Sequence, residues 1–319
     1  MSFSSATKEE IANLRIKKPC CRLAAFAALV QLAGSLQLGA GGKRSVVLTT
    51  ESYAVARWAV KLSKALYSLE SVILVKEHKR LGKNRSFSIS LSGEQEVMEG
   101  MLLDVGMLCQ TEEGLTFGSG LNEALLKEDC CKRAYLRGAF MGGGSLSNPE
   151  RGYHLEFVVR TSSLAGDLCR LLNEYDLRSK TVERNGAAVV YIKESERITD
   201  FLALIGAHGA LLELETVKTN KEFKNGLNRR FNCETANIKK TVDASLRQKD
   251  NIRYLINHDA FSSLSPELRS AAEARIEYPE ATLAELGALL DPPVGKSGVN
   301  HRLRKLERIA LSLKDKKGE

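Results

Sequence analysis

The stretch Tyr135–Ser145, YLRGAFMGGGS, decides the fold of this chain. Four glycines interrupt an apolar pattern that is otherwise typical of a helix. Small residues at this density let the backbones of two helices approach closely, so we expect the stretch to form one half of a tight helix pair. The chain must therefore contain a second helix of the same kind.

A matching helix lies far upstream, in the first part of the chain. It ends LAAFAALVQLAGS, and its Gly34-Ser35 corresponds to Gly144-Ser145. Ser52, at the start of a later predicted helix, precedes Ser162 by the same offset in residue number. Two landmarks with one offset favour an internal duplication. The alternative is a pair of unrelated core helices that are rich in alanine and glycine.

Each half of the duplication continues with strands and helices in the same order. After its small-residue helix, the first half shows patterns for a hairpin over 36–50, a helix over 52–68, a hairpin over 71–91 and a helix over 94–108. The second half shows a strand over 154–160, a helix over 162–175, a hairpin over 178–193 and a helix over 195–206. We therefore predict an α+β domain of two αββαββα repeats, at about 20–108 and 129–206.

This arrangement resembles the LAGLIDADG homing-endonuclease fold. The resemblance implies that DNA binds on a saddle of antiparallel strands, and that each repeat places one carboxylate immediately before its Gly-Ser, beside a scissile phosphate. Those positions hold Ala33 and Gly143 here, and neither residue can ligate a divalent metal ion. The neighbouring residues supply no carboxylate either: Gln31, Leu32, Met141 and Gly142. We expect a nuclease scaffold that has lost its catalytic acids.

The first repeat carries a basic hairpin tip, HKRLGKNR, over 78–85. Its four positive charges, with no acid among them, are Lys79, Arg80, Lys83 and Arg85. Such a tip suits contacts with DNA phosphates, which bind without reading sequence. The serines of the following strand, 86–91, alternate with apolar residues and should line the same surface. A solvated tip with flexible charges is the alternative. The corresponding turn of the second repeat, ERNG, is shorter, so we expect a duplex to be held asymmetrically.

Beyond Gly206 the composition shifts toward lysine, arginine and asparagine. Ile238, Val242 and Leu246 recur at a spacing of four, which predicts a partly exposed helix. Arg229 and Arg230 in NRRFNCETANIKKTV suit contacts with phosphates or base edges, or else cross-links at the domain junction. We expect a domain over 1–215, a helical linker over 216–259 and a C-terminal domain over 260–319.

Capping signals place helix starts at both ends of the chain. Thr7 with Glu10, and Thr282 with Glu285, each form a predicted capping box. Ser265-Pro266 predicts the start of a helix that Pro279 ends. After the turn DPPVGK, Ser297 is predicted to cap a third C-terminal helix.

That third helix has one apolar stripe and one basic face. The stripe includes Val299, Leu303 and Leu306, and between Lys296 and Lys317 there are eight basic and two acidic residues. A short helix, a turn and a basic helix are typical of a helix-turn-helix, whose recognition helix enters the major groove. A helical docking or dimerisation module is the alternative. The expected DNA-binding residues of the recognition helix are Lys296, Ser297, Asn300, His301, Arg302, Arg304 and Lys305, which Thr282, Glu285 and the stripe support.

The composition of the chain limits the number of domains, the kind of partner and the kinds of metal site that we expect. The 319 residues are long enough for two domains, and the formal net charge of +8 favours a polyanionic partner. Seven cysteines with two vicinal pairs and no CxxC spacing indicate reduced thiols, and five scattered histidines give no metal site. We expect no bound metal or cofactor, no membrane segment or export signal, and a cytoplasmic location.

Several strings extend over nearly the whole chain and together resemble the WhiA family of bacterial proteins: MSFSSATKEE, YLRGAFMGGGSLSNPERGYHLEF, NCETAN and GKSGVNHRLRKL. The resemblance implies a nucleoid-associated, sequence-specific transcription regulator without nuclease activity, linked to sporulation and to cell division or chromosome segregation. Double-stranded DNA is then the expected partner. Another transcription regulator or RNA polymerase is a further candidate, and the oligomeric state stays open.

Two alternatives belong to other classes of protein. A metal-dependent homing-type endonuclease would have to take its acids from elsewhere in the chain. A maturase-like RNA-binding protein would use the same scaffold, but the deep, narrow major groove of A-form RNA excludes a recognition helix.

Overall fold

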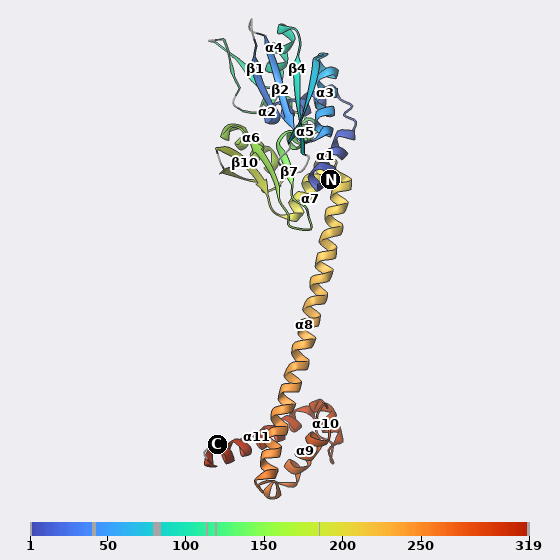
Figure 1. Cartoon of the computed structure of the whole chain (residues 1–319), viewed down its shortest axis with the longest axis vertical. Helices are drawn as coiled ribbons and strands as arrows, with labels where there is room; N and C mark the ends of the chain where they lie inside the picture. The colour runs from blue at the N-terminus through green and yellow to red at the C-terminus, as the bar shows by residue number, and fades with distance from the viewer. Residues whose placement is uncertain are drawn as a thin grey trace. The chain divides into compact units, whose positions relative to one another are not determined.

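The computed structural model describes residues 2–39, 43–78, 84–112, 114–118, 120–184 and 186–317. The chain divides into two compact units, Met1–Asn220 and Lys221–Glu319 (Figure 1). None of the helices in the described ranges combines the length and the apolarity that a membrane crossing needs.

Two helices form the centre of the first unit. They are α2 (Pro19–Ala33) and α5 (Asp129–Gly143), and they pack along each other. A Cβ atom built on Gly138 would lie only 2.0 Å from the carbonyl oxygen of Ala25, so glycine is what allows this approach. Tyr135 donates its hydroxyl hydrogen to the side-chain oxygen of Gln31 inside the interface. The predicted tight helix pair is confirmed.

Each central helix runs directly into a four-stranded antiparallel sheet. The first sheet has the strand order β1 (Gly34–Leu38), β2 (Arg44–Thr50), β4 (Asn84–Ser92) and β3 (Glu70–His78). The second has the equivalent order β7 (Gly144–Leu146), β8 (Leu155–Val159), β10 (Ala187–Ile192) and β9 (Lys180–Arg184). Gly34 pairs with Leu48 and Gly144 pairs with Phe157, so both sheets begin at the predicted Gly-Ser landmarks.

Four helices cover the two sheets. They are α3 (Tyr53–Tyr67) and α4 (Gln95–Asp104) in the first repeat, and α6 (Ser162–Asn173) and α7 (Ser195–Ile205) in the second. Their buried faces meet the sheets and the helix pair in one continuous core that includes Trp58, Met98, Leu168 and Phe201. The predicted α+β order of two matching repeats is confirmed.

The helix predicted over 94–108 is shorter than expected. It ends at Asp104, and Leu108 already lies in β5 (Leu108–Thr111), which pairs with β6 (Gly114–Phe117). Gly106 explains the stop, because it adopts φ of +74°, a left-handed conformation that favours glycine. A short 3-10 helix, η2 (Glu123–Leu126), then leads into α5.

The predicted capping box of the N-terminal helix is wrong. Helix α1 (Phe3–Asn13) begins one turn before Thr7, with Ser2 as its cap. The hydroxyl of Thr7 instead donates to the carbonyl of Phe3, and Glu10 accepts hydrogen bonds from the backbone of another helix. Helix α6 begins at Ser162, as predicted, and the hydroxyl of Thr161 caps it by accepting from the backbone N–H of Leu164 at 3.3 Å.

The long helix α8 (His208–Asn257) spans the point where the chain passes from one unit to the other. Its first turn lies in the first unit, where the Glu10 carboxylate accepts from the backbone N–H groups of Gly209, at 2.7 Å, and Ala210, at 3.1 Å. The helix starts at His208, ahead of the expected linker over 216–259. Glu10 therefore acts as a side-chain cap from a distant segment, and the local sequence gave no sign of it.

The second unit is entirely helical in its described residues. After the end of α8 and a 3-10 turn, η3 (Phe261–Ser263), follow α9 (Pro266–Glu277), α10 (Leu283–Leu289) and α11 (Lys296–Lys317). Ile252 and Leu255 of α8 share a core with α9, α10 and α11. Helix α9 starts after Ser265 with Pro266 in its first turn and ends before Pro279, as predicted.

Candidate nucleic-acid interface

Two local contacts fix the start of α10 and the turn that joins it to α11. The Thr282 hydroxyl accepts from the backbone N–H of Glu285, and the Glu285 carboxylate accepts from the backbone N–H of Thr282 at 2.7 Å, so this predicted capping box is confirmed. A Cβ atom on Gly287 would lie 1.9 Å from the carbonyl oxygen of Val294, so only glycine lets the turn fold onto α10.

A buried stripe fixes the rotation of α11 about its own axis. Val299, Leu303 and Leu306 are each at most 2% exposed, and they pack on α9 and α10 in the core of the second unit. At 3.6 residues per turn, the side chains opposite this stripe point away from the core. Those side chains are Ser297, His301, Arg304, Lys305 and Arg308, and all of them are exposed.

The other predicted recognition residues lie at the flanks and at the start of α11. Asn300 and Arg302 are half-buried beside the stripe, and Lys296 is exposed in the first turn. Ser297 is not the helix cap, because the carbonyl of Gly295 accepts the first intrahelical hydrogen bond, from Val299 at 3.1 Å. Ser297 thus sits inside the first turn, where the N–H groups and the helix dipole favour an anion.

Within the described part of the second unit, none of the recognition-helix cations takes part in an ion pair. Lys296, Arg302, Arg304 and Lys305 have no carboxylate within 4.0 Å of their nitrogen atoms. Their charges are therefore available to an external polyanion without first breaking an internal pair.

Helix α8 carries a second exposed basic segment. Arg229 and Arg230 are exposed, in the part of α8 that belongs to the second unit. The predicted apolar seam is exposed as well, since Ile238, Val242 and Leu246 are 64%, 50% and 52% exposed. These three side chains line one wall of a shallow groove whose other wall includes Pro279 and Thr282.

In the first unit, a hollow of about 800 Å³ lies where the two sheets meet the ends of α2 and α5. Strands β2 and β4 contribute hydroxyl groups from Thr49, Ser86 and Ser88, as the alternation of serines in 86–91 predicted. Ile89 and Leu91 face the core from the other side of β4. This hollow contains both positions at which a LAGLIDADG nuclease would carry its acids, Ala33 and Gly143.

Packing closes the acid position of the second repeat. A Cβ atom on Gly143 would lie 2.7 Å from the carbonyl oxygen of Val158 and 2.9 Å from a methyl group of Leu32. Glu51 is the sole carboxylate among the described residues that line the hollow. A single carboxylate cannot provide the shared oxygen ligands that hold a divalent ion between two repeats.

The lining of the hollow is basic, and the sequence did not identify these residues as a group. Lys8, Lys76 and Arg160 converge on it from α1, β3 and the end of β8. Burial lowers the pKa of the Lys8 ammonium to about 8, while the Glu51 carboxylate opposes that shift. Arg160 donates to the hydroxyl of Ser35 at 3.3 Å and so links the two repeats. Only tertiary packing brings these three side chains together.

The basic hairpin tip is described only at its base. The predicted phosphate contacts Lys79, Arg80 and Lys83 lie outside the described residues. Arg85 is exposed and its Nε donates to the Glu77 carboxylate at 3.0 Å, an exposed ion pair that a phosphate could replace at small cost. Strands β3 and β4 have nine residues each, whereas β9 has five and β10 has six. The two arms of the fold are thus unequal, as the turn lengths predicted.

Three family models match successive parts of the chain. The WhiA N-terminal LAGLIDADG-like domain matches residues 19–108, the WhiA LAGLIDADG-like domain matches 132–224, and the WhiA C-terminal HTH domain matches 227–310. The chain is 45% identical to the probable cell division protein WhiA of Alkaliphilus metalliredigens over 97% of its own length and 98% of the relative.

Two solved structures share the fold. The full-length DUF199/WhiA protein from Thermatoga maritima has a TM-score of 0.60 at 23% identity, and the match covers 98% of this chain and 99% of that one. The N-terminal LAGLIDADG domain of DUF199/WhiA has a TM-score of 0.51 at 22% identity, and the match covers 64% of this chain and 90% of that one. At these identities the likeness concerns the fold alone.

Proposed function

The chain belongs to the WhiA family, and from this premise we propose that it is a sequence-specific regulator that binds double-stranded DNA and acts in cell division. The observation that carries the proposal is the outer face of α11, where Ser297, His301, Arg304 and Lys305 point away from a buried helix-turn-helix core. A rigid helix with exposed, unpaired cations and polar groups is what major-groove recognition requires.

The residues of α11 divide by their position on the helix. Arg304 and His301 lie opposite the buried stripe, so they point furthest from the core and suit hydrogen bonds to base edges. Asn300 and Arg302 flank the stripe and are placed to contact DNA at the edges of the same major groove. Lys296 and Ser297 in the first turn suit a backbone phosphate, because the helix N-terminus attracts anions.

The first unit supplies a sequence-independent surface in this proposal. Lys8, Lys76 and Arg160 line a hollow at the position where the homing-endonuclease fold holds its DNA. With the tip residues Lys79, Arg80, Lys83 and Arg85, they would contact phosphates and add affinity without adding specificity. Arg229 and Arg230 on α8 would add two further contacts of this kind. We assign sequence reading to 260–319, phosphate binding to 1–215 and the helical linker to 216–259.

The biological role follows from the relatives. The curated relative from Alkaliphilus is named a probable cell division protein, and we propose the same process for this chain, acting through transcription at the cytoplasmic nucleoid. A role in sporulation, and a complex with RNA polymerase or with another regulator, extend the proposal beyond that name.

The test of α11 compares Arg304→Ala and Asn300→Ala with Arg253→Ala, which removes an exposed charge from α8 in the same unit. Duplexes selected from a random library provide the preferred site, and fluorescence anisotropy gives the affinity for that site and for a scrambled duplex. We expect a loss of about 1–3 kcal/mol per variant on the preferred site and a much smaller loss on the scrambled one. An equal loss on both duplexes would show that α11 binds phosphates only.

The proposal also states that the protein does not cleave DNA. Purified protein should leave supercoiled plasmid intact with magnesium or manganese, since the hollow offers one carboxylate, Glu51, among its described lining residues. Metal-dependent nicking that disappears in Glu51→Gln would contradict this part of the proposal. Nicking that persists in this variant and stays with the protein through a further purification step would contradict it as well, whereas nicking that the purification removes comes from a contaminating nuclease.

A further inference from the structure

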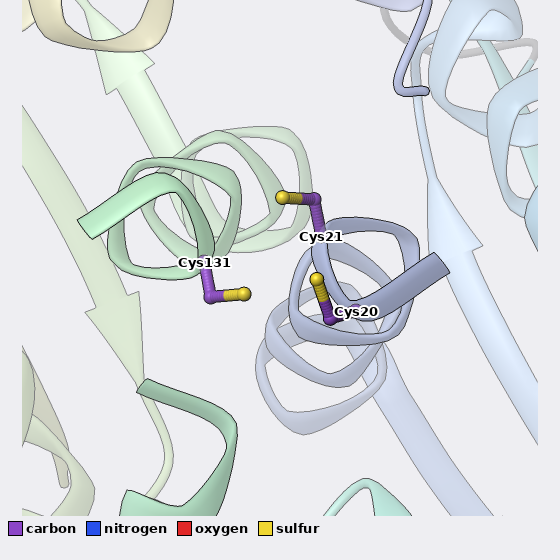
Figure 2. A group of neighbouring side chains, drawn as sticks. All are labelled: Cys20, Cys21 and Cys131. Atoms are coloured by element: carbon purple, nitrogen blue, oxygen red, sulfur yellow. The ribbon is translucent and has the colours of Figure 1, made fainter. Parts of the chain in front are cut away.

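The N-terminal ends of the two central helices carry four cysteines. Cys20 and Cys21 lie in the first turn of α2, and Cys130 and Cys131 lie in the first turn of α5. The sulfur atoms of Cys20, Cys21 and Cys131 all lie within 4.8 Å of one another. Figure 2 shows these three side chains converging from the two helices. Cys130, the neighbour of Cys131 in the first turn of α5, supplies a fourth sulfur nearby, which accepts from the Lys18 ammonium at 3.6 Å.

The internal duplication explains this convergence. Cys20 precedes Cys130, and Cys21 precedes Cys131, by the same offset in residue number that relates Gly34 to Gly144. The two vicinal pairs are therefore equivalent positions of the two repeats. The packing of α2 against α5 brings them together at the ends of the helices opposite their Gly-Ser landmarks. A test for CxxC spacing misses such a site, because the ligands come from two helices rather than from one loop.

The surroundings of the cluster suit negative charge. Four thiolates around a divalent ion carry a net charge of −2, and two helix N-termini point their positive ends at this place. The ammonium of Lys18 lies 3.6 Å from the sulfur of Cys130 and can balance part of the charge. Cys21 and Cys131 are buried while Cys20 is exposed, so the site has a protected interior and an open side for an ion to enter.

We propose that Cys20, Cys21, Cys130 and Cys131 bind one zinc ion as a tetrahedral tetrathiolate site. Zinc–sulfur bonds of about 2.3 Å place the sulfurs of such a site about 3.8 Å apart, so the sulfurs of Cys20, Cys21 and Cys131 must approach by only about 1 Å from their present limit of 4.8 Å. Cys130 would turn its side chain toward them to become the fourth ligand. A set of four sulfur ligands selects zinc or iron over magnesium and calcium, and zinc requires no redox partner. Binding releases the thiol protons to solvent, one for each thiolate formed.

Such an ion would join the first repeat to the second. The contacts of Gly138 and the hydrogen bond between Gln31 and Tyr135 hold the middle of the helix pair together. Zinc would hold the N-terminal ends, where the four cysteines and Lys18 lie. The site would be structural, because four protein ligands leave no open position for substrate.

The experiment uses the full chain, purified with reductant in the absence of oxygen. Metal content by plasma mass spectrometry should give one zinc per chain, and titration of the metal-free protein with cobalt should give the visible bands of tetrahedral thiolate coordination. Added zinc should shift the unfolding transition of the first unit to higher denaturant, followed by the fluorescence of Trp58, the single tryptophan of the chain.

Matched serine variants separate the cluster from other thiols. Cys21→Ser and Cys131→Ser should weaken zinc binding by more than about 100-fold, since changes outside the ligand shell alone cost about 10- to 100-fold. Cys109→Ser and Cys233→Ser alter exposed cysteines elsewhere and should bind zinc as the wild type does. If the buried variants fail to fold, Cys20→Ser tests the same site at its exposed ligand.

Three results would overturn the proposal. The first is reduced, folded protein that gives no thiolate bands with cobalt. The second is zinc affinity that is the same in Cys20→Ser, Cys21→Ser and the wild type. The third is a cluster that holds a disulfide and no metal in protein taken directly from a reducing cytosol, seen as an intact mass lower by two hydrogen atoms.

Discussion

Substitution of Gly138 tests the helix pair on which the first unit is built. In Gly138→Ala, the new methyl group would lie 2.0 Å from the carbonyl oxygen of Ala25 and 2.9 Å from the Cβ of Ala28. An ordinary contact needs at least 3.4 Å, so α2 and α5 must separate locally until the shorter of these distances reaches that value. The obstructing oxygen belongs to the backbone of α2, so no change of side-chain rotamer can relieve the contact.

The expected magnitude comes from two opposing effects. Overpacking of a core costs about 1–3 kcal/mol, and the upper end applies here because a whole helix must move. Alanine in place of glycine within a helix returns about 1 kcal/mol. We therefore expect Gly138→Ala to lower the free energy of unfolding of the first unit by about 2 kcal/mol. Denaturant titration followed by Trp58 fluorescence reports on this unit, because Trp58 is buried in α3.

Two other helical glycines serve as matched controls. A Cβ atom on Gly100, in α4, meets no atom within 4 Å, so Gly100→Ala should raise stability by up to about 1 kcal/mol. Gly142 lies on α5, and its Cβ atom would lie 3.1 Å from the nearest atom, so Gly142→Ala should fall between the two. If Gly138→Ala matched Gly100→Ala in sign and size, the close approach of α2 and α5 would be refuted.

Three further predictions concern the N-terminal helix and the basic surface. Glu10→Ala should lower the free energy of unfolding by about 0.5–2 kcal/mol, because it uncaps α8. Glu9→Ala breaks an exposed ion pair with Arg57 and should lower it by less than about 1 kcal/mol. Equal losses for the two variants in denaturant titration would contradict the cap. The pKa of Lys8 in the folded chain, about 8, lies below its ordinary value of 10.5, so the unfolded chain binds more protons between these pH values and the contribution of Lys8 to stability rises with pH across that window. Lys8→Met should therefore stabilise the first unit at pH 7 and lose this advantage toward pH 10.5, and a gain independent of pH would count against burial of the charge. When Lys79, Arg80, Lys83 and Arg85 are replaced with alanine, the slope of log DNA affinity against log salt concentration should become flatter by up to about 0.9 per lost phosphate contact. The preferred DNA sequence should stay the same. An unchanged slope would mean that the tip does not contact DNA.

The sequence predicted the parts of the fold that follow from local pattern. The hairpins over 36–50 and 71–91, the strand over 154–160 and three of the four helices that cover the sheets were correct, because strand alternation and helical periodicity are visible within a few residues. The fourth helix, α4, exists but ends earlier than predicted. The constant offset between Gly34 and Gly144 extended these local patterns to the order of the whole first unit. The capping box at Thr282 was correct because its two partners are neighbours in sequence.

One error arose where a side chain bonds to a distant segment. Thr7 and Glu10 have the spacing of a capping box, but Ser2 offers an earlier cap and Glu10 bonds to the start of α8, in a remote part of the chain. The hollow formed by Lys8, Lys76 and Arg160 has the same origin, since its residues come from three separate elements. The cysteine cluster differs, because the offset between the repeats relates its two pairs and could have revealed it.

The packing at Gly143 makes an acidic residue at this position hard to introduce by a single substitution. A single codon change could write aspartate at Gly143, yet the new side chain would meet the Val158 carbonyl and the Leu32 methyl group at once. An acidic side chain at this position would first require a smaller residue in place of Leu32 and a shift of β8. A carboxylate at the C-terminal end of α5 thus lies several coordinated substitutions away from the present packing.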